Sequence, residues 1–126
     1  MKKFENDIYT MNIHDDLFLE FIVRKDATLK ESDVWLSKQQ AEEAYPGKKF
    51  YVLLGGEEFF QVTKETREAV ASQKFSTHLA AVALFSNELA MKILGNLYIK
   101  INRPEVPTKF FTDKNNAELW LRSFMK

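Results

Sequence analysis

Two short apolar runs, KFYVLL (residues 49–54) and HLAAVALF (residues 78–85), most limit how this chain can fold. Each is apolar almost throughout, which is typical of a central strand that is covered on both faces. Segments with helical spacing separate and follow the two runs, so the strands are expected to be parallel and joined by helical crossovers. The sequence therefore predicts an α/β domain with a mostly parallel sheet.

The N-terminal part of the chain predicts an antiparallel edge for that sheet. DIYTM (residues 7–11) is expected to form a strand and NIHDD (residues 12–16) the turn after it. LFLEFIVR (residues 17–24) alternates between two faces with a period of two, as a strand does. Thr28 and Glu31 have the spacing of a capping box and predict the start of a helix that ends at Pro46 and Gly47.

The C-terminal half predicts three helices and one further strand. Thr63 is expected to cap a helix over residues 64–73, after a loop in which Gly55 and Gly56 make a turn with positive φ. Ser86 or Asn87 is expected to begin a long helix. TKFF (residues 108–111) predicts the last strand, and Asp113 or Thr112 caps a final helix with an apolar stripe of Ala117, Trp120, Leu121 and Phe124. The predicted order is β-β-α-β-α-β-α-β-α in a single domain over residues 1–126.

Composition excludes several classes of partner. The chain has no cysteine, so disulfides and thiolate metal sites are excluded and a cytoplasmic protein is expected. The 18 basic and 18 acidic residues balance, whereas nucleic-acid binders usually carry a basic excess, so no nucleic-acid partner is expected. The longest apolar run, Leu79 to Phe85, is far shorter than the roughly 20 residues of a membrane helix, so no membrane span is expected.

Strand order, length and the run from Lys49 onward resemble the SpoIIAA-like (STAS-like) fold. The stretch GNLYIKINRPEVPTKFFTD (residues 95–113) is similar to that of a small group of uncharacterised bacterial proteins. The resemblance implies a SpoIIAA-like single domain with an antiparallel edge strand. In the phosphorylated members of that fold, the segment after the central strand carries a regulatory phosphoserine.

Placing Phe60 on the phenylalanine of that phosphorylation motif puts Thr63 on the modified serine. The agreement ends there, because Val62, Lys64 and Glu65 stand where the motif has an acidic residue, a small residue and a glycine. A phosphoryl group on Thr63 would gain from the helix N-terminal amides, and nearby glutamates would repel it. Thr63 is therefore interpreted either as a plain N-cap or as a phosphorylation and anion site.

Neither catalysis nor a metal site is predicted by the remaining polar residues, and no cofactor is expected. His14 lies beside two aspartates, but adjacent turn residues seldom converge on one ion. His78 begins a buried strand, and Glu57 and Glu58 share a solvated loop. If a ligand binds, the carboxyl ends of the parallel strands are where it is expected. That crevice comprises Gly55, Gly56, Glu57, Thr63, Ser86, Asn87 and Asp113.

The segment ELAMKILGNLYIKINRP (residues 88–104) carries two apolar stripes rather than one. One stripe is Met91, Leu94, Tyr98 and Ile101; the other is Leu89, Ile93, Leu97 and Lys100. One stripe suffices to pack on the sheet, so an exposed second stripe predicts a partner surface, although the sequence does not say which stripe is buried. A homodimer is expected, with Met91, Leu94, Tyr98 and Ile101 as its interface. The alternative is that neighbouring segments cover both stripes.

The sequence therefore favours a non-enzymatic protein–protein interaction domain, homodimeric and with a regulatory role. The second hypothesis is a carrier of a small molecule or lipid in a pocket between the sheet and the helices. The partner and the ligand are not identified by the sequence.

Overall fold

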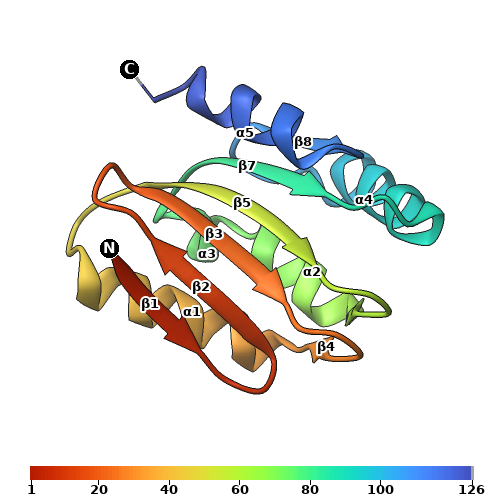
Figure 1. Ribbon diagram of the computed structural model, residues 1–126, viewed down its shortest axis with the longest axis horizontal. Coiled ribbons are helices and arrows are strands. Elements are labelled where there is room, and N and C mark those ends of the chain that lie inside the picture. The colour runs from red at the N-terminus through yellow and green to blue at the C-terminus, as the bar shows by residue number, and fades with distance from the viewer. Residues whose placement is uncertain (126) are drawn as a thin grey trace.

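The computed structural model describes residues 1–125 and is built on a six-stranded mixed sheet (Figure 1). Strands β1, β2 and β3 are antiparallel neighbours, whereas β3, β5, β7 and β8 run parallel. The predicted α/β class with an antiparallel edge is thus confirmed. The strand order across the sheet is β1 (Lys2–Glu5), β2 (Tyr9–Ile13), β3 (Phe18–Val23), β5 (Phe50–Gly56), β7 (Leu79–Phe85) and β8 (Thr108–Phe111).

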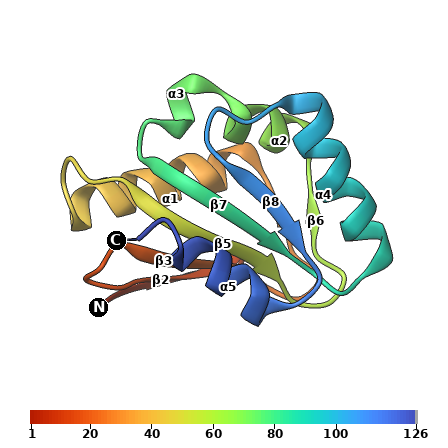
Figure 2. The same cartoon turned by 90° about the horizontal axis from the view of Figure 1, so that it is seen from above.

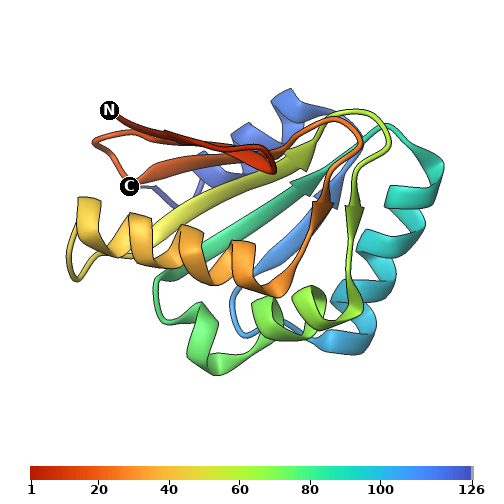
Figure 3. The same cartoon turned by 90° about the horizontal axis from the view of Figure 1, so that it is seen from below.

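Helices cover the two faces of the sheet unequally. One face carries α1 (Glu31–Ala44), α2 (Lys64–Ala71), α3 (Gln73–Ser76) and α4 (Leu89–Asn102), as the view from below shows (Figure 3). The opposite face carries α5 (Lys114–Arg122), which lies across β5 and β7 (Figure 2). Among the described residues, no helix is both long and apolar enough to cross a membrane.

Each face has its own apolar core. The larger core lies under α1 to α3 and includes Tyr9, Phe21, Phe50 and Phe75. The smaller core lies under α5, where Ala117 and Leu121 are fully buried against small side chains of β7. Of the predicted stripe of the last helix, Trp120 is partly buried and Phe124 is exposed. Alanines at positions 81 and 83 let α5 approach β7 closely, since close packing needs short side chains at the contact.

Several local features differ from the sequence predictions. An additional edge strand, β1, pairs with β2, and a short parallel pair joins β4 (Thr28–Leu29) to β6 (Gln61–Val62). Thr28 therefore lies in a strand and does not cap α1. The N-cap is Lys30, whose backbone amide donates to Asp33 Oδ2 at 2.8 Å.

Gly55 and Gly56 belong to β5 and do not form the predicted turn with positive φ. Among the described glycines only Gly47 has a positive φ. The two strand glycines instead make room for aromatic rings. A Cβ atom on Gly55 would lie 2.2 Å from the ring of Phe85, and one on Gly56 would lie 2.4 Å from the ring of Phe60.

Candidate functional site

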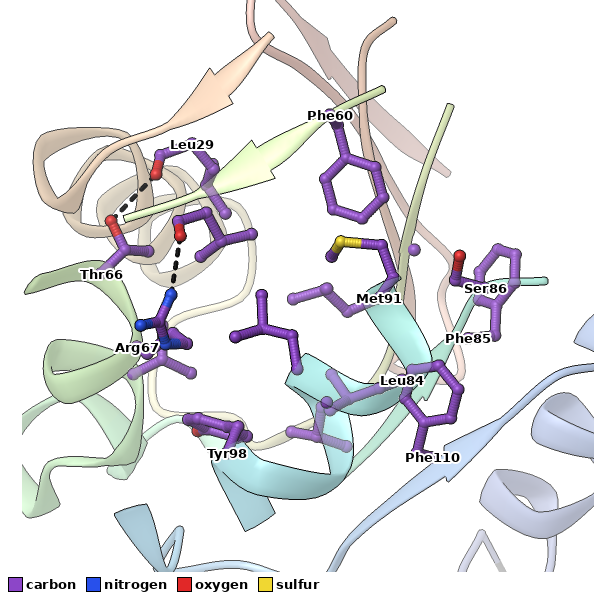
Figure 4. A pocket seen from close by; sticks show the side chains of 17 residues that line it. Leu29, Phe60, Thr66, Arg67, Leu84, Phe85, Ser86, Met91, Tyr98 and Phe110 are labelled. Carbon is purple, nitrogen blue, oxygen red and sulfur yellow. Dashed lines mark hydrogen bonds between the residues drawn. The ribbon is translucent and has the colours of Figure 1, made fainter. Parts of the chain in front are cut away.

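An apolar pocket lies between the sheet and helices α2 and α4 (Figure 4). It has a volume of about 90 Å³. Its floor is a row of facing residues on three neighbouring strands, because the register places Leu54 opposite Leu84 and Leu84 opposite Phe110. We call this cavity the α4 pocket.

Helix α4 forms the roof of the α4 pocket through Met91, Leu94 and Tyr98. Gly95, on the same side of the helix, lies so close to β8 that an added Cβ atom would meet the ring of Phe110 at 2.4 Å. The helix is therefore held against β8 at one edge of the sheet. On the neighbouring strands β5 and β7, the helix does not fully cover Leu54 and Leu84, so these half-buried side chains line a cavity.

Helix α2 and the strand before it supply the side wall of the α4 pocket. Thr66 Oγ1 donates to the carbonyl oxygen of Leu29 at 3.0 Å and lies 2.7 Å from Thr63 Oγ1. A hydroxyl has one proton to donate, so Thr63 donates to Thr66 in that second bond. Arg67 donates from Nη1 to the carbonyl oxygen of Val62 at 2.8 Å. Most of the remaining lining is apolar.

Thr63 is the N-cap of α2, as the sequence predicts. Its Oγ1 accepts the backbone amide of Thr66 at 3.2 Å, and its side chain is half-buried. The hydroxyl thus makes two hydrogen bonds that hold the start of the helix to the short strand pair. A phosphoryl group on this oxygen would remove the donated bond to Thr66.

Of the residues predicted to form a ligand crevice, Gly55 and Ser86 line the α4 pocket. Gly56 contributes indirectly, since it makes room for the ring of Phe60, which lines the pocket. Glu57, Thr63, Asn87 and Asp113 do not line it. Their roles are local: Glu57 Oε1 accepts the backbone amide of Lys25, and Asp113 Oδ1 accepts that of Asn115 as the N-cap of α5.

Ser86 does not cap α4 in the predicted manner. The helix begins after Glu88, and Ser86 Oγ accepts the backbone amide of Glu88 at 3.1 Å. Ser86 is nevertheless buried directly after the C-terminal end of β7, next to the ring of Phe85 in the view of Figure 4. Ser86 thus lies at the end of β7 as predicted, but its hydroxyl stabilises the turn before α4 and does not cap the helix.

Most of the stripe that was predicted to form a dimer interface faces the sheet instead of solvent. Tyr98 is buried, and Met91 and Leu94 are half-buried roof residues of the α4 pocket. Of that predicted stripe only Ile101 is exposed. The exposed large side chains form what we call the outer face of α4: Leu89, Ile93, Leu97 and Ile101.

The histidines lie apart from the α4 pocket. His14 Nε2 is 3.6 Å from Glu20 Oε1 at one end of the sheet, and within residues 1–125 no group of three candidate ligands gathers around a metal position. His78 is buried, and its Nδ1 lies 2.8 Å from the carbonyl oxygen of Phe75. Burial lowers the pKa of His78 to about 4, so this side chain is neutral near neutral pH.

Sequence reasoning missed Arg67 and Tyr98 as pocket residues. An arginine on an amphipathic helix is usually solvated, so no pattern marked Arg67. Tyr98 carried a signal, because it shares a helix side with Gly95, and a glycine within a helix indicates close packing of that side. Burial away from water raises the pKa of Tyr98.

Comparison with known proteins places the fold. A family model described as a domain of unknown function, DUF7793, matches residues 11–125. A crystal structure of an uncharacterized DUF3478-family protein with a SpoIIAA-like fold, from Shewanella loihica PV-4, superposes with a TM-score of 0.65. The sequences are 18% identical, and the match covers 94% of this chain and 98% of that chain. This confirms the SpoIIAA-like fold that the sequence predicts. No curated protein matches the chain.

Proposed function

The chain belongs to the DUF7793 family of domains of unknown function, and we propose that it acts as a non-enzymatic interaction domain that pairs with a second copy. The observation that carries this proposal is the outer face of α4. Four large apolar side chains follow one another along it: Leu89 is 71% exposed, Ile93 54%, Leu97 46% and Ile101 69%. Contiguous apolar patches of this kind mark interaction surfaces in folded proteins.

A second copy of the chain is the partner that this surface fits best. Two-fold pairing brings the same patch of each copy together and is the commonest form of self-association. The chain has 18 basic and 18 acidic residues, so two copies do not repel each other through net charge. Exposed polar residues such as Lys92 and Asn96 flank the patch, and a polar rim around an apolar centre is typical of interfaces.

The polar side chains that line the α4 pocket support a binding role rather than catalysis. The proton of Thr66 is donated to Leu29, and Ser86 Oγ accepts a backbone amide. Neither hydroxyl has a histidine or carboxylate base among its hydrogen-bond partners in the described chain. An activated nucleophile needs such a base within reach. Each hydroxyl therefore serves the local fold.

Light scattering during size exclusion tests the pairing. We expect wild-type protein at micromolar concentration to have about twice the chain mass of 14.7 kDa. Ile93→Glu places a charge in the centre of the outer face of α4 and is expected to give a monomer. Leu119→Glu is the matched control, because Leu119 is 69% exposed on α5, away from that face. A monomeric wild-type protein, or equal dissociation of both variants, would contradict the proposal.

The second candidate function is the binding of a small apolar molecule in the α4 pocket. The cavity of about 90 Å³ and its largely apolar lining favour it, since ligand sites are concave and mostly apolar with a few polar groups. Native mass spectrometry of freshly purified protein is expected to show a retained small molecule. Leu84→Phe, which fills part of the pocket floor, is expected to abolish the added mass. An identical added mass in that variant would exclude the α4 pocket as its site.

A further inference from the structure

We propose that the α4 pocket binds a small amphipathic carboxylate, with its apolar part between Leu84 and Leu94 and its carboxylate at Arg67. This inference rests on the second candidate function and specifies the chemistry of the ligand. It follows from the shape and lining of the cavity and from two polar side chains at its wall that lack a full set of partners.

The size and lining of the α4 pocket define the apolar part of the ligand. The floor residues Leu54 and Leu84 and the roof residue Leu94 present only hydrocarbon. An apolar cavity of about 150 Å³ holds a benzene molecule. The α4 pocket, at about 90 Å³, is smaller, so it suits a short alkyl chain.

Arg67 supplies a positive charge without a counter-charge. Its side chain is half-buried, and it lines the α4 pocket from α2. Within residues 1–125, no carboxylate oxygen lies within 4.0 Å of its guanidinium nitrogens. Among the described residues, its guanidinium makes one hydrogen bond, to the carbonyl oxygen of Val62. A guanidinium has five N–H donors, so most of them remain for a ligand.

Tyr98 adds a second polar group to the same cavity. Its side chain is 8% exposed and lines the α4 pocket, yet its hydroxyl makes no hydrogen bond with the described residues. Figure 4 shows Arg67 and Tyr98 toward one end of the pocket, and Phe85 and Ser86 toward the other. A phenol in this place donates a hydrogen bond to an anion, and burial, which raises its pKa, keeps it protonated.

A carboxylate fits these groups better than a phosphate does. The planar fork of arginine binds a carboxylate with two parallel hydrogen bonds. Arg67 is the one cationic side chain among the pocket's lining residues in the described chain, and it balances a single negative charge. The exposed carboxylates Glu65 and Glu68 flank it on α2 and add negative charge nearby, which disfavours a dianion.

The test compares butanoate with 1-butanol, which has the same number of carbons and no charge. Calorimetric titration of the full chain is expected to show butanoate binding about 10-fold or more tightly than 1-butanol, the range of a charge-assisted hydrogen bond. Arg67→Gln is expected to reduce butanoate affinity to that of 1-butanol. Lys92→Gln removes an exposed cation outside the pocket and is expected to change neither affinity. Amide shifts at Thr66 and Leu94 in NMR spectra locate the bound probe.

Each other outcome has a defined meaning. Equal affinity for the two probes, with amide shifts in the α4 pocket, would overturn the carboxylate inference and leave the apolar ligand function standing. No binding of either probe would remove both. If Arg67→Gln does not fold, Tyr98→Phe decides: we expect it to weaken butanoate binding several-fold and to leave 1-butanol binding unchanged. An unchanged ratio in that variant would overturn the inference.

Discussion

The ring of Phe110 lies against Gly95 of α4 so closely that a Cβ atom on the glycine would come within 2.4 Å of it. This contact between α4 and β8 fixes one edge of the α4 pocket. It also determines which apolar stripe of the helix faces outward, because the side that carries Gly95 is the side that meets the sheet. The candidate ligand pocket and the candidate interface therefore depend on the same contact.

Gly95→Ala is expected to destabilise the protein by about 1–3 kcal/mol, although alanine favours a helix by about 1 kcal/mol. The added methyl group has to displace the ring of Phe110 or push α4 away from β8. Urea unfolding measures the change. The double variant Gly95→Ala with Phe110→Leu removes the clashing ring and is expected to recover part of the loss. A single variant more stable than wild type would show that the contact is looser than the structure indicates.

Thr66→Val is expected to cost about 1–3 kcal/mol, because it keeps the side-chain shape but leaves the carbonyl of Leu29 and the hydroxyl of Thr63 without their partner. The loss should appear in thermal unfolding. Thr112→Val is the matched control, since Thr112 is exposed, and it is expected to change stability little. Equal effects of the two variants would rule out the hydrogen bonds from Thr63 to Thr66 and from Thr66 to Leu29 as a source of stability.

Stability is expected to fall as pH decreases from about 6.5 to about 4, in part because of His78. Burial depresses its folded pKa to about 4, while an ordinary histidine has a pKa of 6.5. Below pH 6.5 the unfolded chain therefore takes up a proton that the folded chain does not. The stability present above pH 6.5 is lost across this window, by up to about 3 kcal/mol.

The comparison that isolates His78 uses His78→Phe, which keeps an aromatic ring beside Phe75 and Phe50. Both proteins carry His14→Gln, so that position 78 alone distinguishes them. Urea unfolding at several pH values is expected to give a smaller acid loss in the phenylalanine variant. Parallel stability curves between pH 6.5 and 4 would show that His78 does not titrate as its burial requires.

Elements whose physics is local could be predicted from the sequence. β5 and β7 match the two apolar runs because a central strand covered on both faces excludes polar residues. The caps of α2 and α5 match because the side-chain oxygens of Thr63 and Asp113 bond to amides two or three residues away. β1 was missed because its sequence, KKFE, is mostly charged, as suits an exposed edge strand.

Features set by distant contacts could not be predicted. Lys38 looks like a surface residue on α1, but its ammonium donates to the carbonyls of Lys74 and Phe75 and to Thr77 Oγ1. The cavity beneath α4 depends on how far the helix stands from β5 and β7, which no periodicity reports. Helical spacing revealed two apolar stripes on α4, but which of their residues are covered depends on packing against β8, and Met91, Leu94 and Tyr98 of the predicted interface face the sheet.

The central claim, that two copies pair through the outer face of α4, is tested most directly by cysteine crosslinking. The chain has no cysteine, so a single substitution provides the one thiol of each copy. Under mild oxidation, Leu97→Cys is expected to form a disulfide-linked dimer of about twice 14.7 kDa within minutes, and Leu119→Cys on α5 is expected to remain a single chain. Equally slow crosslinking of both variants would contradict the pairing of the α4 helices.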